Sequence, residues 1–218
     1  MYHQIRLWDH QLDSSEPFLE NNLQETVIID SDGDVIFYPN FLSIQESDRL
    51  FSDLYSSVSW KQDIIHLYGK KIPLPRLTGW YGDEGKSYIY SGIEQHPDPW
   101  TPTLELIKLK AEEISEVTFN SVLLNLYRHG QDSVSWHSDD EPELGENPII
   151  ASISLGGTRR FSLKHKTSED NKVNLDLPNG SLLLMKGETQ HFWKHQIAKT
   201  AKFVEPRINL TFRVIKPV

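Results

Sequence analysis

The sequence predicts an α+β protein, mainly β, in which two helices precede an antiparallel double sheet, or jelly roll. Two helical patterns lie in the first 120 residues, and short β-type runs separated by turn residues fill most of the remainder. Because 218 residues can form one large core but hardly two, we expect one domain. Within it, residues 1–120 would be an extension with supporting helices, and residues 121–218 the jelly-roll core.

The first 40 residues predict a polar leader and a hairpin. Residues 1 to about 26 are polar and acidic, so we expect them to be partly disordered or to wrap the surface. Apolar runs at 27–29 and 35–38 then flank a turn rich in aspartate and glycine. This arrangement is typical of two short strands around a turn.

Two helices are predicted from their caps and apolar spacing. Ser43 and Glu46 match a capping box, and leucines and a valine follow at helical spacing, which predicts a helix over about 44–58. Thr101 and Pro102 supply an N-cap and a proline at the first helical position, ahead of an apolar stripe. The second helix is therefore expected over about 102–117. Between the two helices, residues 70–92 are rich in Gly, Pro and Tyr.

From residue 121 onward the pattern is that of strands. The β-type runs are 122–128, 149–155, 160–164, 173–177, 181–185 and 207–215. Turn residues separate most of them, and no helical period intervenes. An antiparallel double sheet is the arrangement that this spacing favours.

Composition restricts the setting and the kind of metal site. The chain has no cysteine, which excludes zinc fingers and iron–sulfur clusters, so any metal must be held by imidazole, carboxylate and water. The sequence shows neither a leader peptide nor an apolar run long enough to span a bilayer, so we expect a soluble, intracellular monomer without membrane contact, cytoplasmic in a prokaryote or nuclear in a eukaryote. With a net charge of −9, a nucleic-acid partner would have to meet a local basic patch.

His137 and Asp139 form a candidate metal-binding pair. Residues two apart in a strand or its exit loop project to the same side, and two imidazoles with one carboxylate hold a non-haem Fe(II) while leaving one face open. Alone, the pair is weak evidence, because such triplets are common by chance and usually make a surface hydrogen bond. His191 and His195 both qualify as the second imidazole, and their spacing does not choose between them.

The run from Arg207 to Arg213 has two distinct faces. Its apolar residues alternate with Arg207, Asn209, Thr211 and Arg213. The polar face is either a solvated outer surface or a binding surface. In the second case the two arginine Cα atoms would lie about 20 Å apart, and the side chains, leaning toward each other, would leave a gap suited to a short dicarboxylate.

Several motifs between about residues 75 and 215 occur together in this chain. They are Pro75-Arg76, Tyr81-Gly82-Asp83, Tyr88, Tyr90, Ser91-Gly92, Asn125-Leu126-Tyr127, His137-Ser138-Asp139-Asp140-Glu141, His195 and the segment 206–213. Together they resemble the AlkB family of Fe(II)- and 2-oxoglutarate-dependent nucleic-acid dealkylating dioxygenases. The Asn-Leu-Thr-Phe-Arg run that ends at Arg213 is highly specific to that family.

The resemblance implies a fold, a reaction and a set of site residues. The fold would be a double-stranded β-helix with a nucleotide-recognition lid, and O₂ would be the second cosubstrate. It implies that His195, rather than His191, joins His137 and Asp139 in the catalytic iron site. The residues implied for 2-oxoglutarate are Asn125, Tyr127, Arg207, Asn209 and Arg213.

The substrate implied by the resemblance is an N-alkylated nucleobase, such as 1-methyladenine or 3-methylcytosine, in DNA or RNA, with a single strand expected. A flipped base would stack on aromatic residues of the lid, and a carboxylate would favour a cationic lesion. The residues implied for substrate binding are Arg76, Tyr88, Tyr90, Asp140 and Glu141. Without the resemblance, Tyr88 and Tyr90 would be interpreted as an alternating pair on an ordinary hairpin.

The phosphate path and the exact reaction stay open at this point. The densest basic clusters are Arg159-Arg160 and Lys164-His165-Lys166, with further candidates at Lys70-Lys71, Arg76, Lys194, Lys199 and Lys202. They would either contact phosphates or form a solvated basic hairpin. Two other functions are compatible with the residues: an Fe(II)/2-oxoglutarate hydroxylase of a lipid, peptide or small metabolite, and a non-catalytic jelly-roll binding module.

Overall fold

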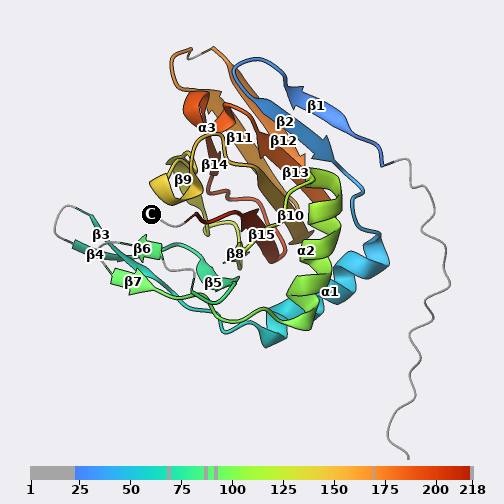
Figure 1. Ribbon diagram of the computed structural model, residues 1–218, viewed down its shortest axis with the longest axis vertical. Coiled ribbons are helices and arrows are strands. Elements are labelled where there is room, and N and C mark those ends of the chain that lie inside the picture. Colours follow the sequence, from blue (N-terminus) through green and yellow to red (C-terminus); the bar gives the residue numbers. More distant parts are fainter. Residues whose placement is uncertain (1–22, 68–69, 86–87, 91–92, 169, 217–218) are drawn as a thin grey trace, which may run out of the picture.

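A computed structural model describes residues 23–67, 70–85, 88–90, 93–168 and 170–216 (Figure 1). The strands of the first half are β1 (Thr26–Ile29), β2 (Asp34–Tyr38), β3 (Ile64–Leu67), β4 (Lys70–Pro73), β5 (Leu77–Gly82), β6 (Tyr88–Tyr90) and β7 (Ile93–Gln95). Those of the second half are β8 (Ser121–Tyr127), β9 (Val134–His137), β10 (Ile150–Gly156), β11 (Arg159–His165), β12 (Lys172–Leu177), β13 (Ser181–Lys186), β14 (Trp193–Ile197) and β15 (Arg207–Arg213). The helices are α1 (Ile44–Ser57), α2 (Pro102–Ser115), the 3₁₀ helix η1 (Pro142–Leu144) and α3 (Thr189–Phe192).

Two antiparallel sheets form the body of the protein. The larger, seven-stranded sheet has the order β1-β2-β13-β10-β15-β8-β5, and the smaller, four-stranded sheet has the order β12-β11-β14-β9. This mainly β double sheet, with few helices, is the predicted jelly-roll fold. Strands from both sides of residue 121 share the larger sheet, while the division of the chain at that residue stays a prediction.

The two long helices start where their caps predicted. The Ser43 hydroxyl accepts a hydrogen bond from the Glu46 amide at 3.2 Å, and the Thr101 hydroxyl accepts one from the Leu104 amide at 3.3 Å. The second helix ends at Ser115, because Glu116 adopts a left-handed conformation with φ 56°. Both predicted helices are confirmed to within two residues.

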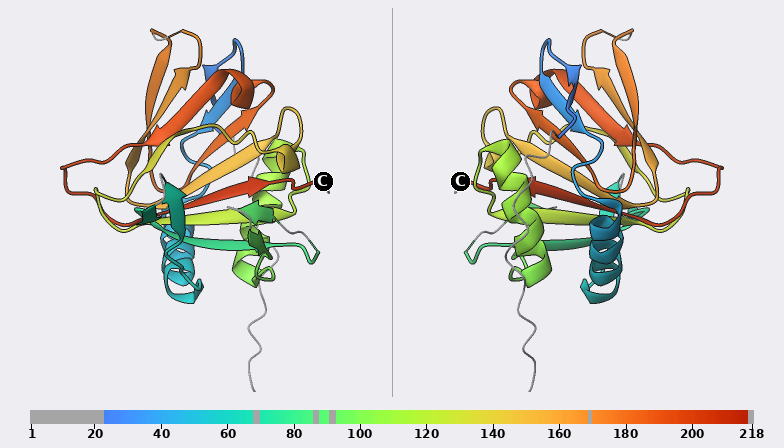
Figure 2. Two further views of the ribbon diagram at one scale, coloured as in Figure 1. Left: turned by 90° about the vertical axis from the view of Figure 1, so that its left-hand side faces the viewer. Right: turned by 90° about the vertical axis from the view of Figure 1, so that its right-hand side faces the viewer.

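The elements form three layers. Figure 2 shows α1 and α2 against one face of the larger sheet and the smaller sheet on its other side. Between helices and larger sheet lies a core that includes Leu54, Ile107, Leu124 and Phe212. A second core between the two sheets includes Phe161, Leu163 and Met185. The hairpins β3–β4 and β6–β7 lie away from the helices, near the open edge of the double sheet (Figure 1).

A glycine pair turns the chain from the larger sheet to the smaller one. Gly156 ends β10 with φ +81°, a conformation that favours glycine, and a Cβ atom there would lie 2.5 Å from the Pro206 carbonyl. The Gly157 amide donates to the same carbonyl at 2.8 Å. The start of β11 is thereby held beside the start of β15.

Some elements were not predicted. The strands β5, β9 and β14 and the short helix α3 had no strand or helix prediction of their own, although His137 was expected in a strand or its exit loop. Residues 1–22, which make up most of the predicted polar leader, lie outside the described residues. Within the described part of the chain, no helix has the length and apolarity needed to cross a membrane.

Candidate active site

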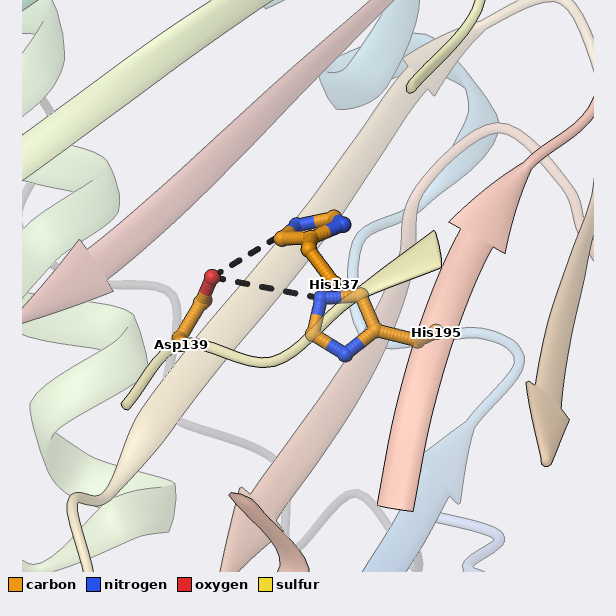
Figure 3. Close-up of side chains that lie close together, drawn as sticks. All are labelled: His137, Asp139 and His195. Atoms are coloured by element: carbon orange, nitrogen blue, oxygen red, sulfur yellow. Dashed lines mark ion pairs between the residues drawn. The ribbon is translucent and has the colours of Figure 1, made fainter. Parts of the chain in front are cut away.

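Two side chains of the smaller sheet and one from the loop after β9 converge on one point. His137 ends β9, Asp139 follows it two residues later, and His195 lies on the neighbouring strand β14, directly opposite His137 in the strand register. In Figure 3 both imidazoles and the carboxylate point toward one another. Strand pairing thus joins residues that are far apart in the sequence.

The spacing of these three groups fits a single metal ion. The Asp139 Oδ1 atom lies 3.6 Å from His137 Nε2 and 4.0 Å from His195 Nε2, and all the donor atoms lie within 4.8 Å of one another. Ligands bound to one ion at about 2.0–2.2 Å are at most about 4.4 Å apart. A small side-chain adjustment therefore brings the three onto one ion, and two imidazoles with one carboxylate are the set that suits Fe(II).

Neighbouring groups orient the candidate ligands. The Nδ1 atom of His137 lies 2.8 Å from the Ser135 carbonyl oxygen, which can only accept a hydrogen bond, so Nδ1 is the donor and Nε2 is the ring nitrogen that faces Asp139. The Asp139 amide donates to the side-chain oxygen of Gln190 on α3 at 2.9 Å. Gln190 is 1% exposed, and sequence reasoning missed it because it lies 51 residues away from Asp139 in the chain.

Electrostatics put the candidate ligands into the protonation states that a metal needs. Burial would raise the pKa of Asp139, but Arg213 and the two imidazoles outweigh it and hold the pKa to about 2. The Arg213 guanidinium donates to Asp139 Oδ2 at 2.8 Å. Burial is the main reason that the pKa of His195 falls to about 3. Near neutral pH the carboxylate is thus ionised and the His195 imidazole is neutral.

The polar face of β15 lines the same cavity as the three candidate ligands. Arg207, Asn209, Thr211 and Arg213 line it from the larger sheet, opposite His137, Asp139 and His195. The apolar residues Ile208, Leu210 and Phe212 are fully buried on the other face. Arg207 is 1% exposed, so the interpretation of this face as a solvated surface is wrong.

Serines on β10 fix the polar side chains of β15. The Ser154 hydroxyl accepts from Arg207 Nη2 and the Ser152 hydroxyl accepts from Asn209 Nδ2, both at 2.9 Å. The Nε and Nη1 atoms of Arg207 are buried without a hydrogen-bond acceptor. A ligand carboxylate is the chemical group that would satisfy such donors. Tyr127, which the family resemblance implies as a 2-oxoglutarate ligand, lines the same cavity as these β15 residues.

Other predicted site residues lie around this cavity. Asn125 faces Asn209 across the β8–β15 register, and its side-chain oxygen accepts from Arg76 Nε at 2.7 Å. Asp140 is exposed and lies 3.4 Å from Lys166, while Glu141 is half-buried at the start of η1. Tyr88 and Tyr90 lie on β6, but their side chains fall outside the described part of the structure.

The two candidate second histidines have different positions. His195 is 5% exposed and belongs to the cluster, where the centre of its ring lies 4.2 Å from the centre of the His137 ring. His191 is exposed on α3. Within the described residues, the cluster of candidate metal ligands contains His195 and not His191.

Comparison with known proteins identifies the family. The model of the 2OG-Fe(II) oxygenase superfamily matches residues 34–213. The chain is 44% identical over 192 residues to human alpha-ketoglutarate-dependent dioxygenase alkB homolog 3, an alignment that covers 84% of this chain and 66% of the relative. It is 38% identical over 180 residues to human DNA oxidative demethylase ALKBH2, covering 78% of this chain and 69% of the relative.

A solved structure supports the same fold. The structure of OsALKBH1 matches with a TM-score of 0.58 and 16% identity over 83% of this chain and 96% of that one. In the sequence alignments, the chain spans about two thirds of the length of the alkB homolog 3 proteins. From the superfamily match and the identity to two AlkB homologues, it follows that this chain belongs to the AlkB family of 2OG-Fe(II) oxygenases.

Proposed function

We propose that this protein is an Fe(II)- and 2-oxoglutarate-dependent dioxygenase that removes N-alkyl groups from nucleobases in nucleic acid, and so repairs alkylation damage directly. The observation that carries the proposal is the convergence of His137, Asp139 and His195 in a cavity whose opposite wall presents Arg207 and Arg213. The names of the relatives, a dioxygenase dependent on alpha-ketoglutarate and a DNA oxidative demethylase, support the same reaction.

The triad would hold the iron. Bound Fe(II), with 2-oxoglutarate and O₂, would supply an oxidation in which one oxygen atom enters succinate, formed with loss of CO₂, and the other hydroxylates the N-alkyl carbon, so that an aldehyde and the unmodified base are released. The carboxylate of Asp139 supplies negative charge to the cation, and Ser135 and Gln190 hold the ligands in place.

The β15 arginines would hold the cosubstrate. Arg207 has two donor groups without acceptors, and Arg213 already bridges to Asp139. Arg207 would therefore bind the carboxylate remote from the metal, and Arg213 the one beside it. Asn209 and Tyr127 would complete the contacts, and Asn125 would act from the next strand, where Arg76 fixes its amide. Apolar residues of the cavity wall, such as Phe161 and Ile197, exclude water from the reacting atoms.

Base recognition would come from the acidic residues after the triad and from the lid. Asp140 and Glu141 follow the ligand Asp139 directly, which places negative charge next to the site for a cationic base. Since Lys166 holds Asp140 at the surface, Glu141 is the more sheltered of the two acids. Tyr88 and Tyr90 on β6 would provide stacking surfaces for the flipped base.

A surface on the outer face of the smaller sheet is our candidate for the phosphate path. Lys164 lies directly opposite both Lys172 and Lys194 in the strand register, and no carboxylate of the described residues lies within 4.0 Å of these three amines. The amines of Lys164 and Lys172 lie 4.6 and 5.8 Å from the ring of Trp136, the residue before His137. Adjacent like charges are unfavourable unless an anion joins them, and lysines around an aromatic ring suit a single strand.

The decisive test is turnover with a defined lesion. The full chain is incubated with Fe(II), 2-oxoglutarate and a single-stranded oligonucleotide that carries one 1-methyladenine, and succinate and the mass of the base are measured. His195→Ala should abolish both signals, and the control His191→Ala, altered at the exposed histidine of α3, should retain them. Succinate without demethylation would favour a hydroxylase of another substrate, and no turnover by the unaltered protein would favour a binding module.

The strand preference and the phosphate path are tested together. Single-stranded DNA should be bound more tightly than the duplex. The Lys164→Glu/Lys172→Glu variant should lose about 0.7 of the salt slope for each phosphate contact removed. The control Lys108→Glu/Lys110→Glu, on α2 at the far side of the larger sheet, should leave the slope unchanged. Equal slopes in both variants would remove this surface from the path, whatever the outcome for the reaction itself.

A further inference from the structure

Arg159, at the start of β11, occupies an unusual position for an arginine. The sequence offers the Arg159-Arg160 pair as a candidate phosphate contact, but Arg159 is 3% exposed and does not reach the surface. Arg160, the next residue, points outward and pairs with Asp176 at 3.0 Å. Strand alternation thus separates the two arginines, and Arg159 has another role.

The guanidinium of Arg159 bridges the loop after β8 and the loop after β14. Its Nη2 atom donates to the carbonyl oxygens of Asp132 at 2.9 Å and Ala198 at 2.8 Å, and its Nη1 atom reaches the His129 carbonyl at 3.4 Å. These acceptors are neutral carbonyl groups, so they provide hydrogen bonds to Nη1 and Nη2 without neutralising the charge of Arg159.

Tyr127 links Arg159 to the candidate cosubstrate site. The Arg159 Cζ atom lies 5.5 Å from the centre of the Tyr127 ring, and the Arg207 Cζ atom lies 5.3 Å from the same centre. Tyr127 is itself 2% exposed. Two buried cations therefore share one aromatic ring, and Arg207 lines the cavity next to it.

Within the described residues, neither cation has a carboxylate partner within 4.0 Å. The nearby carboxylate of Asp132 is engaged by Arg128, at 2.8 and 3.0 Å. Burying a charge without a counter-ion is costly. Asp132 is near enough to attract Arg159, but its carboxylate is already paired with Arg128, so within the described residues the positive charge beside Tyr127 is only partly offset.

We propose that Arg159 is a positioning and specificity-determining residue for the cosubstrate: from behind Tyr127 it adds positive potential at Arg207 and so selects a ligand with a second carboxylate. The inference rests on the proposed function, since it assumes that a dicarboxylate enters the cavity. Arg159 touches no ligand itself. Arg159 would act through the electrostatic potential that it creates at Arg207 and by holding the Tyr127 ring in position.

The size of the effect follows from Coulomb's law. The Arg159 and Arg207 Cζ atoms lie 5.5 and 5.3 Å from the Tyr127 ring centre, so they are at most 10.8 Å apart. A carboxylate held by Arg207 would then lie on the order of 10 Å from the Arg159 charge, and at an effective dielectric constant of about 20 this attraction corresponds to a roughly tenfold gain in affinity. A ligand that lacks the second carboxylate gains nothing from it. The signature of Arg159 is thus a difference between two ligands.

The experiment measures binding by calorimetry with the full chain loaded with Mn(II), which avoids turnover. The two ligands are 2-oxoglutarate and 2-oxopentanoate, which has the same chain length and a methyl group in place of the second carboxylate. Arg159→Gln should weaken 2-oxoglutarate binding about tenfold and leave 2-oxopentanoate within about twofold. The matched control Arg160→Gln should change neither affinity.

Equal losses for the two ligands in Arg159→Gln would overturn the proposal, because they would indicate a merely structural role. Arg159→Lys provides a second route if the glutamine variant does not fold. Lysine keeps the charge but cannot bond to both carbonyls at once, so this variant should keep the preference for 2-oxoglutarate. Loss of the preference in folded Arg159→Lys would also overturn the proposal. If the unaltered protein shows no preference for 2-oxoglutarate, the proposed function itself fails.

Discussion

Replacement of Gln190 by methionine tests how the fold holds the candidate metal ligands. The side-chain oxygen of Gln190 accepts the Asp139 amide at 2.9 Å, and its Nε2 atom lies 3.8 Å from the sulfur of Met185. Methionine has a similar length but offers no comparable acceptor. Because Gln190 is 1% exposed, water cannot replace it without a cavity, and the Asp139 amide would be left buried and unpaired.

Two magnitudes follow for Gln190→Met. An unpaired buried amide costs about 1–3 kcal/mol of unfolding free energy. Loss of a group that orients a metal ligand lowers metal affinity about 10–100-fold. Both effects arise from the one hydrogen bond, so they should appear together.

The assay combines urea unfolding of the metal-free protein with calorimetric titration of Mn(II). Gln196→Met, altered on the same strand as His195 but away from the cluster of candidate ligands, is the control and should change Mn(II) affinity by less than about twofold. A Gln190→Met protein that loses stability but binds Mn(II) as tightly as the unaltered chain would refute the reasoning, because the bond would then be structural only.

Three further predictions concern stability. Phe212→Ala, at a fully buried residue in contact with Phe119 and Trp100, should lower the unfolding free energy in urea by about 3–5 kcal/mol, whereas Phe203→Ala, at a side chain 86% exposed, should change it by less than about 0.5 kcal/mol. Burial would raise the pKa of Asp132, but hydrogen bonds from Arg128 outweigh burial and lower the pKa below its ordinary value of 3.8. The stability that ionised Asp132 supplies is therefore present above the ordinary pKa, and it is lost as the pH falls through the lowered pKa. Asp132→Asn should flatten the stability profile across that acid range, and an unchanged slope would contradict the sign. Ser43→Ala should cost about 1 kcal/mol by removing the cap of α1, measured by thermal unfolding with Ser56→Ala as a control inside the helix.

The sequence predicted best those features that depend on local pattern. The caps at Ser43 and Thr101 located two helices, and the alternation along 207–213 separated a core face from a polar face. It failed for β14, because His195 points inward at a position where an apolar residue would mark a strand. A candidate metal ligand at an inward position thus made this strand hard to predict from the apolar pattern.

Long-range partners could not be predicted from a single sequence. The bond from Asp139 to Gln190 joins residues 51 positions apart, and the shared ring of Tyr127 depends on three strands meeting. The dibasic Arg159-Arg160 pattern suggested a surface cluster, whereas the strand places one residue inside and the other outside. Such contacts depend on how distant segments fold together, which the spacing of residues along the chain does not show.

The cavity draws one wall from each of the two sheets, with the imidazoles on the smaller and the guanidinium groups on the larger. A ligand that binds to both walls therefore cross-links the two sheets non-covalently. Ligand binding should reduce local opening between the sheets, so the rates of amide hydrogen exchange in β14 and in β15 should decrease together. In this architecture, the side chains that bind the ligand are also the ones through which the ligand joins the two sheets.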